Sequence, residues 1–308
     1  FEFERNGSVF AFNCNDVIVG EDLTIDPQLI FSTYSGSTSD NFGYTATYDQ
    51  SGYLYSGSSA FGQGYPTSIG AYQELWGGGD GSGTLAGTDI AISKYDLSGT
   101  FMQWSTFIGG QRDELPHSLV VNENDEIWIY GSSGSSNFPI TSNALDTTFN
   151  GGVSFSPQGV GTTYILGSDI VISHLSADGS TMLNSTFWGG SGNDGVNTAT
   201  GLKYNYADEF RGEIDIDPSG NIVVVGTTNS ADFPIYPNSN PNSMGMQDAF
   251  ISVFNADMSQ LILSRLVGGS EDESGCSVAF DSTQHIYLCG GTQSLDFSTT
   301  SGCYQNQY

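Results

Sequence analysis

A segment that recurs four times at nearly constant spacing is the strongest constraint on the fold of this chain. Each copy contains a serine and, a few residues later, one or two glycines. The copies lie at 29–36, 104–110, 184–190 and 263–269, and their serines, which are 73, 80 and 79 positions apart, are Ser32, Ser105, Ser185 and Ser264. A fixed period of this length indicates a repeat architecture in which each copy is one structural unit.

The order of elements inside each copy predicts four short antiparallel strands. An acidic residue follows the glycines, and after it come an alternating strand, a tight turn and a second strand that ends in Gly with Ser or Thr. A loop, a third strand that begins with Asp and a second turn then lead into the serine segment, the fourth strand. The acidic residues that we align are Asp40, Asp113, Asp194 and Asp272. This plan predicts an all-β fold, a β-propeller built of four-stranded antiparallel blades.

The repeat also divides the chain into regions. We expect a fourth strand at 27–36, units at about 37–110, 111–190 and 191–269, and a partial unit at 270–308, which together make about three and a half blades of an incomplete ring. The third unit carries an insertion of 14 residues between Asp194 and Asp217. Residues 1–26 do not follow the repeat, and we interpret them as the tail of a preceding N-terminal domain.

The recurring elements resemble the SBBP repeat, a β-propeller repeat of large secreted proteins of Bacteroidota. The resemblance covers about residues 27–308 and rests on Ser-Thr-x-x-Gly-Gly, a following Asp, Asp-x-x-Gly, Gly-x-Thr and Phe-Pro. Departures include Arg265 in place of Thr and Asn122 in place of Asp. The resemblance implies export by a type IX route, an extracellular or outer-cell-surface location, and a role in gliding, adhesion or surface assembly.

Composition limits the partners. Six Lys and Arg residues against 34 Asp and Glu residues give a formal net charge of −28, which lacks the cationic surface that nucleic-acid binding requires. No apolar stretch approaches the roughly 18 residues needed to cross a bilayer. We therefore expect no nucleic acid and no membrane insertion. The expected partner is a protein or glycan at the cell surface, and a type IX secretion component is one such protein.

Long loops join the second and third strands and should share one face with the loops between units, because successive strands alternate in direction. Aromatic residues in those long loops are candidates for ligand contact: Tyr65, Tyr72, Trp76, Phe149 and Phe155. Long loops on a rigid scaffold commonly carry recognition. The alternative is that these aromatic side chains pack the loops onto the blades.

Metal and cysteine chemistry receive little support. Acidic loop residues offer oxygen ligands that calcium accepts, namely Asp80, Asp194, Asp272 and Glu273, but no EF-hand or nonapeptide pattern is present. The repeated Asp residues instead favour side-chain to backbone hydrogen bonds that hold their loops. Cys276 and Cys289 fall on neighbouring predicted strands, so either a disulfide or two free thiols fits.

No cofactor and no catalytic residue is predicted, and calcium at the acidic loop residues is kept only as an alternative. His174 stands where other units have Lys94 and Val253, and no Ser lies in a nucleophile elbow. We expect a noncatalytic extracellular β-propeller module for binding, adhesion or scaffolding. One alternative is a propeller that binds or degrades polysaccharide, and another is a secretion cargo bound to its export machinery.

Overall fold

The computed structural model describes residues 2–6, 9–13, 29–78, 87–158, 161–205, 207–237, 245–281 and 283–306. The chain divides into two compact units, Phe1–Ser32 and Thr33–Tyr308. The first unit contains one antiparallel hairpin, formed by β1 (Glu2–Asn6) and β2 (Val9–Asn13). The predicted preceding region at 1–26 overlaps this first unit.

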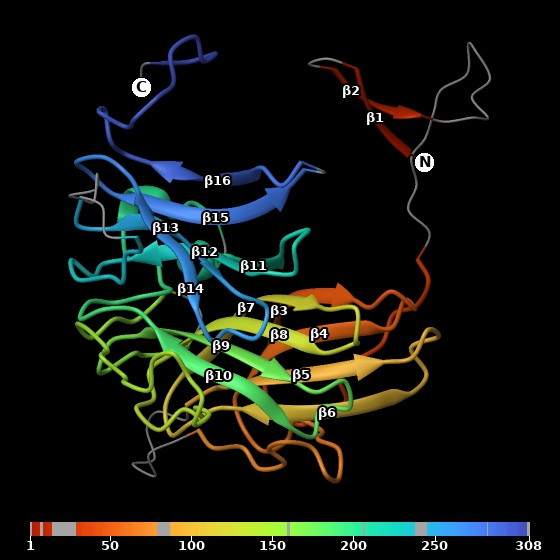
Figure 1. Cartoon of the computed structure of the whole chain (residues 1–308). Helices are drawn as coiled ribbons and strands as arrows, with labels where there is room; N and C mark the ends of the chain where they lie inside the picture. Colours follow the sequence, from red (N-terminus) through yellow and green to blue (C-terminus); the bar gives the residue numbers. More distant parts are fainter. Residues whose placement is uncertain are drawn as a thin grey trace. The chain divides into compact units, whose positions relative to one another are not determined.

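The second unit consists of antiparallel sheets whose strands follow one another in chain order (Figure 1). The first sheet is β3 (Asn41–Tyr48), β4 (Leu54–Ala60), β5 (Asp89–Tyr95) and β6 (Met102–Ile108). The second is β7 (Glu114–Val121), β8 (Ile127–Ser133), β9 (Asp169–Leu175) and β10 (Met182–Trp188). The third is β11 (Glu213–Ile216), β12 (Ile222–Thr228), β13 (Asp248–Phe254) and β14 (Leu261–Val267), and the fourth has only β15 (Glu273–Phe280) and β16 (Ile286–Thr292).

Helical structure in the described residues is limited to two short 3-10 turns, η1 (Thr200–Leu202) and η2 (Asp208–Phe210). The sheets therefore confirm an all-β chain made of repeated four-stranded antiparallel units. The innermost strands lie against one another across the sheets, since β3 contacts β7, β7 contacts β11, and β11 contacts β15. This arrangement is propeller-like, and no closed ring is seen in the part of the chain that the structure describes.

The recurring serine has a structural reason. In each complete sheet it lies on the fourth strand, is buried, and exchanges a hydrogen bond with a serine of the third strand. The oxygen pairs are Ser93 and Ser105 at 2.8 Å, Ser173 and Ser185 at 3.1 Å, and Ser252 and Ser264 at 3.0 Å. Because each buried hydroxyl finds its partner in the neighbouring strand, the pair fixes the register between those strands.

Hydrophobic side chains fill the spaces between adjacent sheets. The first and second sheets bury a cluster that includes Ile92, Trp104 and Val171, and the second and third bury another around Trp188 and Phe250. The Trp104 indole also donates to the Ala177 carbonyl at 2.9 Å, which joins the first two sheets. At about 25 cal/mol per Å² of apolar surface removed from water, these layers are the main stabilising contribution.

The fourth strand predicted at 27–36 differs from the structure. Residues 27 and 28 lie outside the described residues, and 29–36 do not form a strand. The side chains of Leu29, Ile30 and Tyr34 are 76%, 73% and 96% exposed. An outer strand needs a neighbouring strand to satisfy its backbone groups, and no strand pairs with this segment among the described residues.

Candidate functional site

The inserted segment of the third unit marks the place where the repeat is interrupted. Structural equivalence corrects our alignment there, because Asp194 corresponds to Glu114 and Glu273 and not to Asp113. Each of these three carboxylates accepts a hydrogen bond from the backbone N–H of the second glycine in the preceding Gly-Gly pair, four residues earlier, at 2.7 to 2.9 Å. Asn193 takes the Asp113 position. The insertion is therefore one residue longer than predicted, and we define residues 198–212 as the insertion loop.

Three of the four inner strands carry one bulged residue at the position where the third unit has its insertion. In β3, β7 and β15 the register shifts around Tyr44, His117 and Cys276, respectively. Asn197 is the equivalent residue of the third unit and leads into the insertion loop. A bulge leaves the extra residue outside the ladder and turns its side chain away from the regular alternation. These positions are where the repeat can present different side chains on one scaffold.

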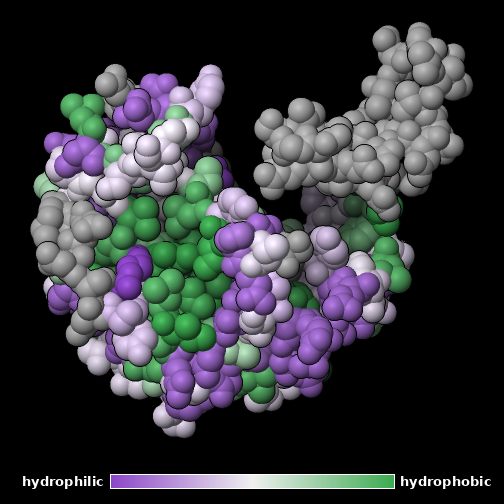
Figure 2. Space-filling model, turned by 45° about the horizontal axis from the view of Figure 1, so that its top comes forward, coloured by the Kyte–Doolittle hydropathy of each residue, from purple (hydrophilic) through white to green (hydrophobic). Residues whose placement is uncertain are grey.

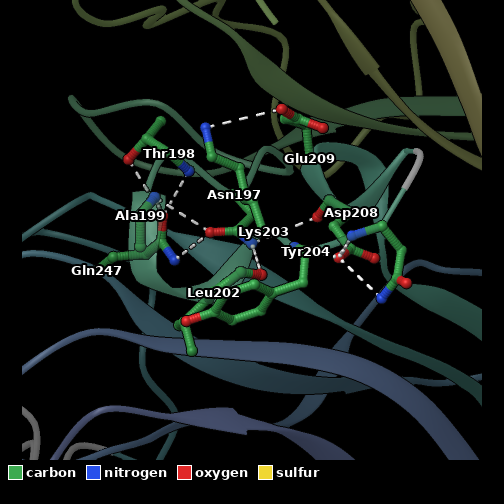
Figure 3. Close-up of polar contacts among 10 residues, drawn as sticks. Asn197, Thr198, Ala199, Leu202, Lys203, Tyr204, Asp208, Glu209 and Gln247 are labelled. Carbon is green, nitrogen blue, oxygen red and sulfur yellow. Dashed lines mark hydrogen bonds and ion pairs between the residues drawn. The ribbon is translucent and has the colours of Figure 1, made fainter. Parts of the chain in front are cut away.

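Gln247 anchors the start of the insertion loop (Figure 3). Its side-chain oxygen accepts hydrogen bonds from the backbone N–H groups of Thr198 at 2.6 Å and Ala199 at 3.1 Å. Its amide nitrogen donates to Asn197 Oδ1 at 2.8 Å and to the Glu273 carbonyl at 3.1 Å. Gln247 is only 1% exposed, so these contacts satisfy a buried amide and tie the loop to the fourth sheet.

The second half of the insertion loop is held by charged side chains (Figure 3). Asp208 Oδ2 accepts from the backbone N–H groups of Tyr204 at 2.8 Å and Asn205 at 2.6 Å, and Asp208 Oδ1 accepts from Arg211 Nε at 3.3 Å. Lys203 Nζ lies 3.7 Å from Glu209 Oε1. The N–H donors and Arg211 lower the pKa of the Asp208 carboxyl despite the opposing effect of burial. The loop is thus a structured element with its own polar contacts.

Phe210 fixes the loop against the inner strands. Its side chain is 4% exposed and belongs to a buried cluster with Leu115 and Tyr164. The ring lies edge-on to Tyr44 at 6.1 Å between centroids, and 5.7 Å from the His117 ring. One residue of the insertion loop therefore contacts side chains of the first and second sheets, which brings the third unit's loop to the bulged positions.

A cavity of about 450 Å³ opens where these elements meet. Its walls include all the bulged residues and the end of the insertion loop, and the fourth sheet closes one side: the residues are Gly43, Tyr44, Thr45, His117, Ser118, Ala207, Phe210, Arg211, Gly212, Glu213, Cys276 and Ser277. We call this the central cavity. A second cavity of about 350 Å³ borders the other part of the loop and is lined in part by Lys203, Tyr204 and Glu209.

The polar groups of the central cavity differ in character. Burial lowers the pKa of His117 to about 3, so the imidazole is neutral at pH 7. Its Nε2 lies 3.1 Å from Ser132 Oγ, and its Nδ1 has no hydrogen-bond partner among the described residues. Glu213 Oε2 accepts from Ser277 Oγ and from the Val278 N–H, both at 2.6 Å. Burial raises the pKa of the Cys276 thiol.

Arg211 is the cationic group of this cavity. Its side chain is 51% exposed, and the sequence has only six Lys and Arg residues in total. Two of the six, Lys203 and Arg211, belong to the insertion loop and border its two cavities. Each of these two cations pairs with an acid of the same loop, Lys203 with Glu209 and Arg211 with Asp208, so that the loop is electrically neutral in a chain of net charge −28. The arrangement offers hydrogen-bond donors, acceptors and aromatic rings to a polar ligand.

The predicted aromatic candidates mostly support the long loops. Tyr65 is 2% exposed, and its hydroxyl pairs with Ser93 Oγ at 2.9 Å, so it is not available on the surface as predicted. Tyr72, Trp76 and Phe149 are partly buried against the sheet clusters. Phe155 is also partly buried, but it lies beside the insertion loop, with Lys203 Nζ 5.6 Å from its ring centroid. Only this last candidate adjoins the site.

Two of the four acidic candidates, Asp194 and Glu273, are engaged in loop contacts. Asp194 accepts from the Gly190 N–H, Ser230 Oγ and Thr228 Oγ1, while Glu273 accepts from the Gly269 N–H and Thr292 Oγ1. Asp272 lies next to Glu273 and is partly buried, and Asp80 lies outside the described residues. No cluster of three or more acidic, His or Cys side chains suited to a metal occurs in the described ranges.

Cys276 and Cys289 lie on the paired strands β15 and β16, as predicted, and both are free thiols. The register explains why, because Cys289 pairs with Ser277 while Cys276 occupies the bulge. In the described part of the chain, no helix has the length and apolar character needed to cross a membrane.

Comparisons with known proteins place the chain in no family. No family model and no curated protein matches it. A crystal structure of a protein of unknown function from Dyadobacter fermentans is similar, with 12% identity and a TM-score of 0.41 over 85% of this chain and 64% of that one. A gluconolactonase from Xanthomonas campestris has 13% identity and a TM-score of 0.29 over 81% and 69% of the two chains. The chain thus spans less than two thirds of the first of these two proteins.

Proposed function

We propose that this chain is a noncatalytic extracellular β-propeller module that binds a protein or glycan at the cell surface and belongs to a larger protein exported by a type IX route. In this proposal the four-stranded sheets are blades of an incomplete ring of about three and a half blades, and the repeat is of the SBBP type found in Bacteroidota. The motif order and the acidic, Lys-poor composition support the proposal.

The central cavity carries the proposal. Repeated sheets need no insertion in order to pack, yet one unit extends a loop that Gln247 and Phe210 hold beside the bulged residues. The loop brings Arg211 to a cavity that otherwise presents neutral donors and acceptors and Glu213. Long structured loops on a rigid scaffold are the usual location of binding sites. The proposed ligand is therefore a polar group with at least one acceptor for the guanidinium.

Binding fits this cavity better than polysaccharide cleavage. Glycoside hydrolysis generally uses two carboxyl groups on either side of the scissile bond. Among the residues that line the central cavity, Glu213 is the acidic one, and its Oε2 already accepts two hydrogen bonds. Carbohydrate recognition without cleavage remains within the proposal, because sugar hydroxyls are acceptors and donors of the required kind.

The test is a binding survey of the purified chain against glycan arrays and surface proteins from Bacteroidota cells, repeated with Arg211→Ala. Arg112→Ala is the matched control, since Arg112 has the same charge but does not line the cavity. We expect Arg211→Ala to weaken binding of the identified partner by at least about tenfold, which corresponds to 1.4 kcal/mol. Equal affinities for the two variants would refute a central-cavity site, and hydrolysis of a bound glycan would refute the noncatalytic role.

A further inference from the structure

One row of side chains crosses the second, third and fourth strands of each complete sheet, and its chemistry changes from sheet to sheet. The members of a row pair with one another between adjacent strands. The rows are Tyr55, Lys94 and Trp104 in the first sheet, Trp128, His174 and Asn184 in the second, and Val223, Val253 and Leu263 in the third. Because the row of the third sheet is entirely apolar, the fold does not require polar groups at these positions.

In the first sheet the row holds a cation that belongs to the chain itself. The Lys94 ammonium lies 3.0 Å from Asp49 Oδ2 and 4.7 Å from the centroid of the Tyr55 ring. Trp104 fills the neighbouring position, where its indole donates to the Ala177 carbonyl. A carboxylate and an aromatic face together stabilise a buried ammonium. The first row therefore shows that the scaffold accommodates an ammonium group at this position.

The row of the second sheet has similar surroundings without the cation. His174 takes the place of Lys94 and stacks on Trp128, with 3.9 Å between the ring centroids. Its Nε2 lies 3.2 Å from Glu126 Oε2. Burial lowers the pKa of His174 against the opposing effect of this carboxylate, so the imidazole is neutral at pH 7. Glu126 therefore lies beside a neutral ring, whereas Asp49 lies beside an ammonium.

A cavity of about 840 Å³ opens beside the second row, between the second and third sheets. Its lining includes Trp128, His174 and Asn184, together with four acidic residues and no Lys or Arg. The acidic residues are Glu123, Glu126, Asp217 and Asp257. We call this the intersheet cavity. The corresponding cavity beside the first row measures about 600 Å³ and includes Lys94 in its lining. Asn184 is much smaller than Trp104, which contributes to this difference in volume.

Asn184 adds a buried acceptor to the intersheet cavity. The residue is only 3% exposed, and its Nδ2 donates to the Asp257 carbonyl at 3.1 Å, which fixes the orientation of the amide. Its Oδ1 has no hydrogen-bond partner among the described residues. Because an unpaired buried acceptor is unfavourable, this oxygen favours a ligand that donates a hydrogen bond.

Acidic charge alone does not mark a site in this chain, which has 34 Asp and Glu residues. Hydrophilic residues spread over the face of the second unit that Figure 2 shows, beside a broad hydrophobic area. The intersheet cavity differs because it combines carboxylates, an unpaired buried acceptor and an aromatic stack at positions where the first row holds Lys94. A positive group that donates hydrogen bonds suits all three features.

We propose that the intersheet cavity binds a primary ammonium group on an alkyl chain, the chemistry of a lysine side chain, in the place that Lys94 has in the first row. The three N–H donors of the ligand serve Asn184 Oδ1 and the Glu126 carboxylate, and the other acidic residues raise the local concentration of cations. The site lies between two complete sheets and shares no lining residue with the central cavity. The inference is therefore independent of the central-cavity proposal.

The peptide acetyl-Gly-Gly-Lys-Gly-Gly-amide is the probe, and the indole N–H signals of the whole chain, labelled with ¹⁵N-tryptophan, are the readout. Titration should shift the Trp128 signal saturably and leave the Trp104 signal unchanged, because the row of Trp104 already holds Lys94. Trp128→Phe identifies the signal. The same peptide with Nε-acetyllysine should bind at least about tenfold more weakly, since it keeps the alkyl chain but loses the charge.

Two variants of the chain test the comparison between rows. His174→Lys supplies an internal ammonium and should weaken peptide binding at least about tenfold, because the internal cation competes for Glu126. Thr181→Lys is the matched control, since it adds the same charge to the same sheet at an exposed position that does not line the cavity. This control should bind the peptide as the parent does. Urea unfolding midpoints show that both variants fold.

Cadaverine distinguishes the two sources of an alkylammonium group. Affinity equal to that of the peptide indicates a free amine and weaker binding indicates a lysine within a polypeptide, and both results support the ammonium site. Absence of a saturable Trp128 shift, equal binding of the acetylated peptide, or equal affinities of the His174→Lys and Thr181→Lys variants would each overturn the proposal. Arg211→Ala should leave peptide binding unchanged, so failure of this site and failure of the central cavity are distinguishable.

Discussion

Asp89→Asn should stabilise the protein at pH 8 and leave its stability nearly unchanged at pH 4. Asp89 is fully buried, and its Oδ2 accepts from Gln73 Nε2 at 3.0 Å and from the Gly77 N–H at 2.8 Å. Its Oδ1 has no hydrogen-bond partner among the described residues. A Cβ placed on Gly109 would lie 2.6 Å from Asp89 Oδ1 and 2.8 Å from Glu114 Oε2, so the two carboxyl groups approach the same point.

The sign of the effect follows from burial. Desolvation raises the pKa of Asp89 from 3.8 to about 7, and it also raises the pKa of Glu114, with the Asp89 charge contributing. A raised folded-state pKa contributes stability below the unfolded value, near pH 4, and that contribution is lost as the pH rises toward 7. About three pKa units at 1.36 kcal/mol each give a loss of about 4 kcal/mol by pH 8.

Asn removes this titration without removing the useful contacts. Its side-chain oxygen can still accept from Gln73 and Gly77, while its amide nitrogen replaces Oδ1 and can donate to the Glu114 carboxylate. Urea unfolding of both proteins from pH 4 to 8 should therefore show a difference in unfolding free energy that grows with pH. The control is Asp96→Asn, because hydrogen bonds from Ser98 and the Phe101 N–H lower the pKa of that exposed carboxyl, so the aspartate favours the folded state above pH 4. A difference for Asp89→Asn that is independent of pH, or a variant less stable than the parent at pH 8, would refute the reasoning.

Three further substitutions test the scaffold and the site. Phe210→Ala should lower the free energy of unfolding by about 3–5 kcal/mol and increase hydrogen exchange in the insertion loop, since it removes a buried ring; unchanged exchange there would contradict its anchoring role. Gly268→Ala should lower the thermal midpoint strongly, because its Cβ would meet Asp248 Oδ1 at 2.5 Å, while Gly43→Ala, with nothing within 4 Å, should have little effect. Gln247→Ala should cost about 1–3 kcal/mol by leaving buried N–H groups unpaired, and a neutral result would show that water replaces the amide.

The strands of the sheets could be predicted from the sequence because the same residue types recur at equivalent positions in each unit. The serine of the fourth strand and the Asp that begins the third strand occupy equivalent places in each complete sheet, and the turns between strands carry residues suited to reversal. The same reasoning misplaced Asp194 by one position. Two of the units have Asp and Glu at adjacent positions, so Asp194 could be aligned with either of them. Only the hydrogen bond from the Gly190 N–H shows that Asp194 is the carboxylate that caps the turn.

The central cavity was not predicted from the sequence. The length of the insertion gave a signal, but its contacts join residues far apart in the chain, such as Phe210 with Tyr44 and Gln247 with Thr198. No periodicity encodes such pairs. The aromatic loop residues were predicted as a binding face, but the sequence does not distinguish an exposed binding ring from a buried packing ring. Tyr65 is a buried packing ring.

Variation between copies identifies the positions at which specificity can arise. The turn-capping position is acidic in three units, as Glu114, Asp194 and Glu273 show, because each accepts a hydrogen bond from a glycine N–H, and Asn41 stands there in the first unit. The bulged position differs in every unit: Tyr44, His117, Asn197 and Cys276. A bulged side chain is released from strand pairing, so its chemistry can change at little cost to the sheet. Since three of these four side chains line one cavity and the fourth begins the loop that borders it, the variation is concentrated where a ligand would make contact.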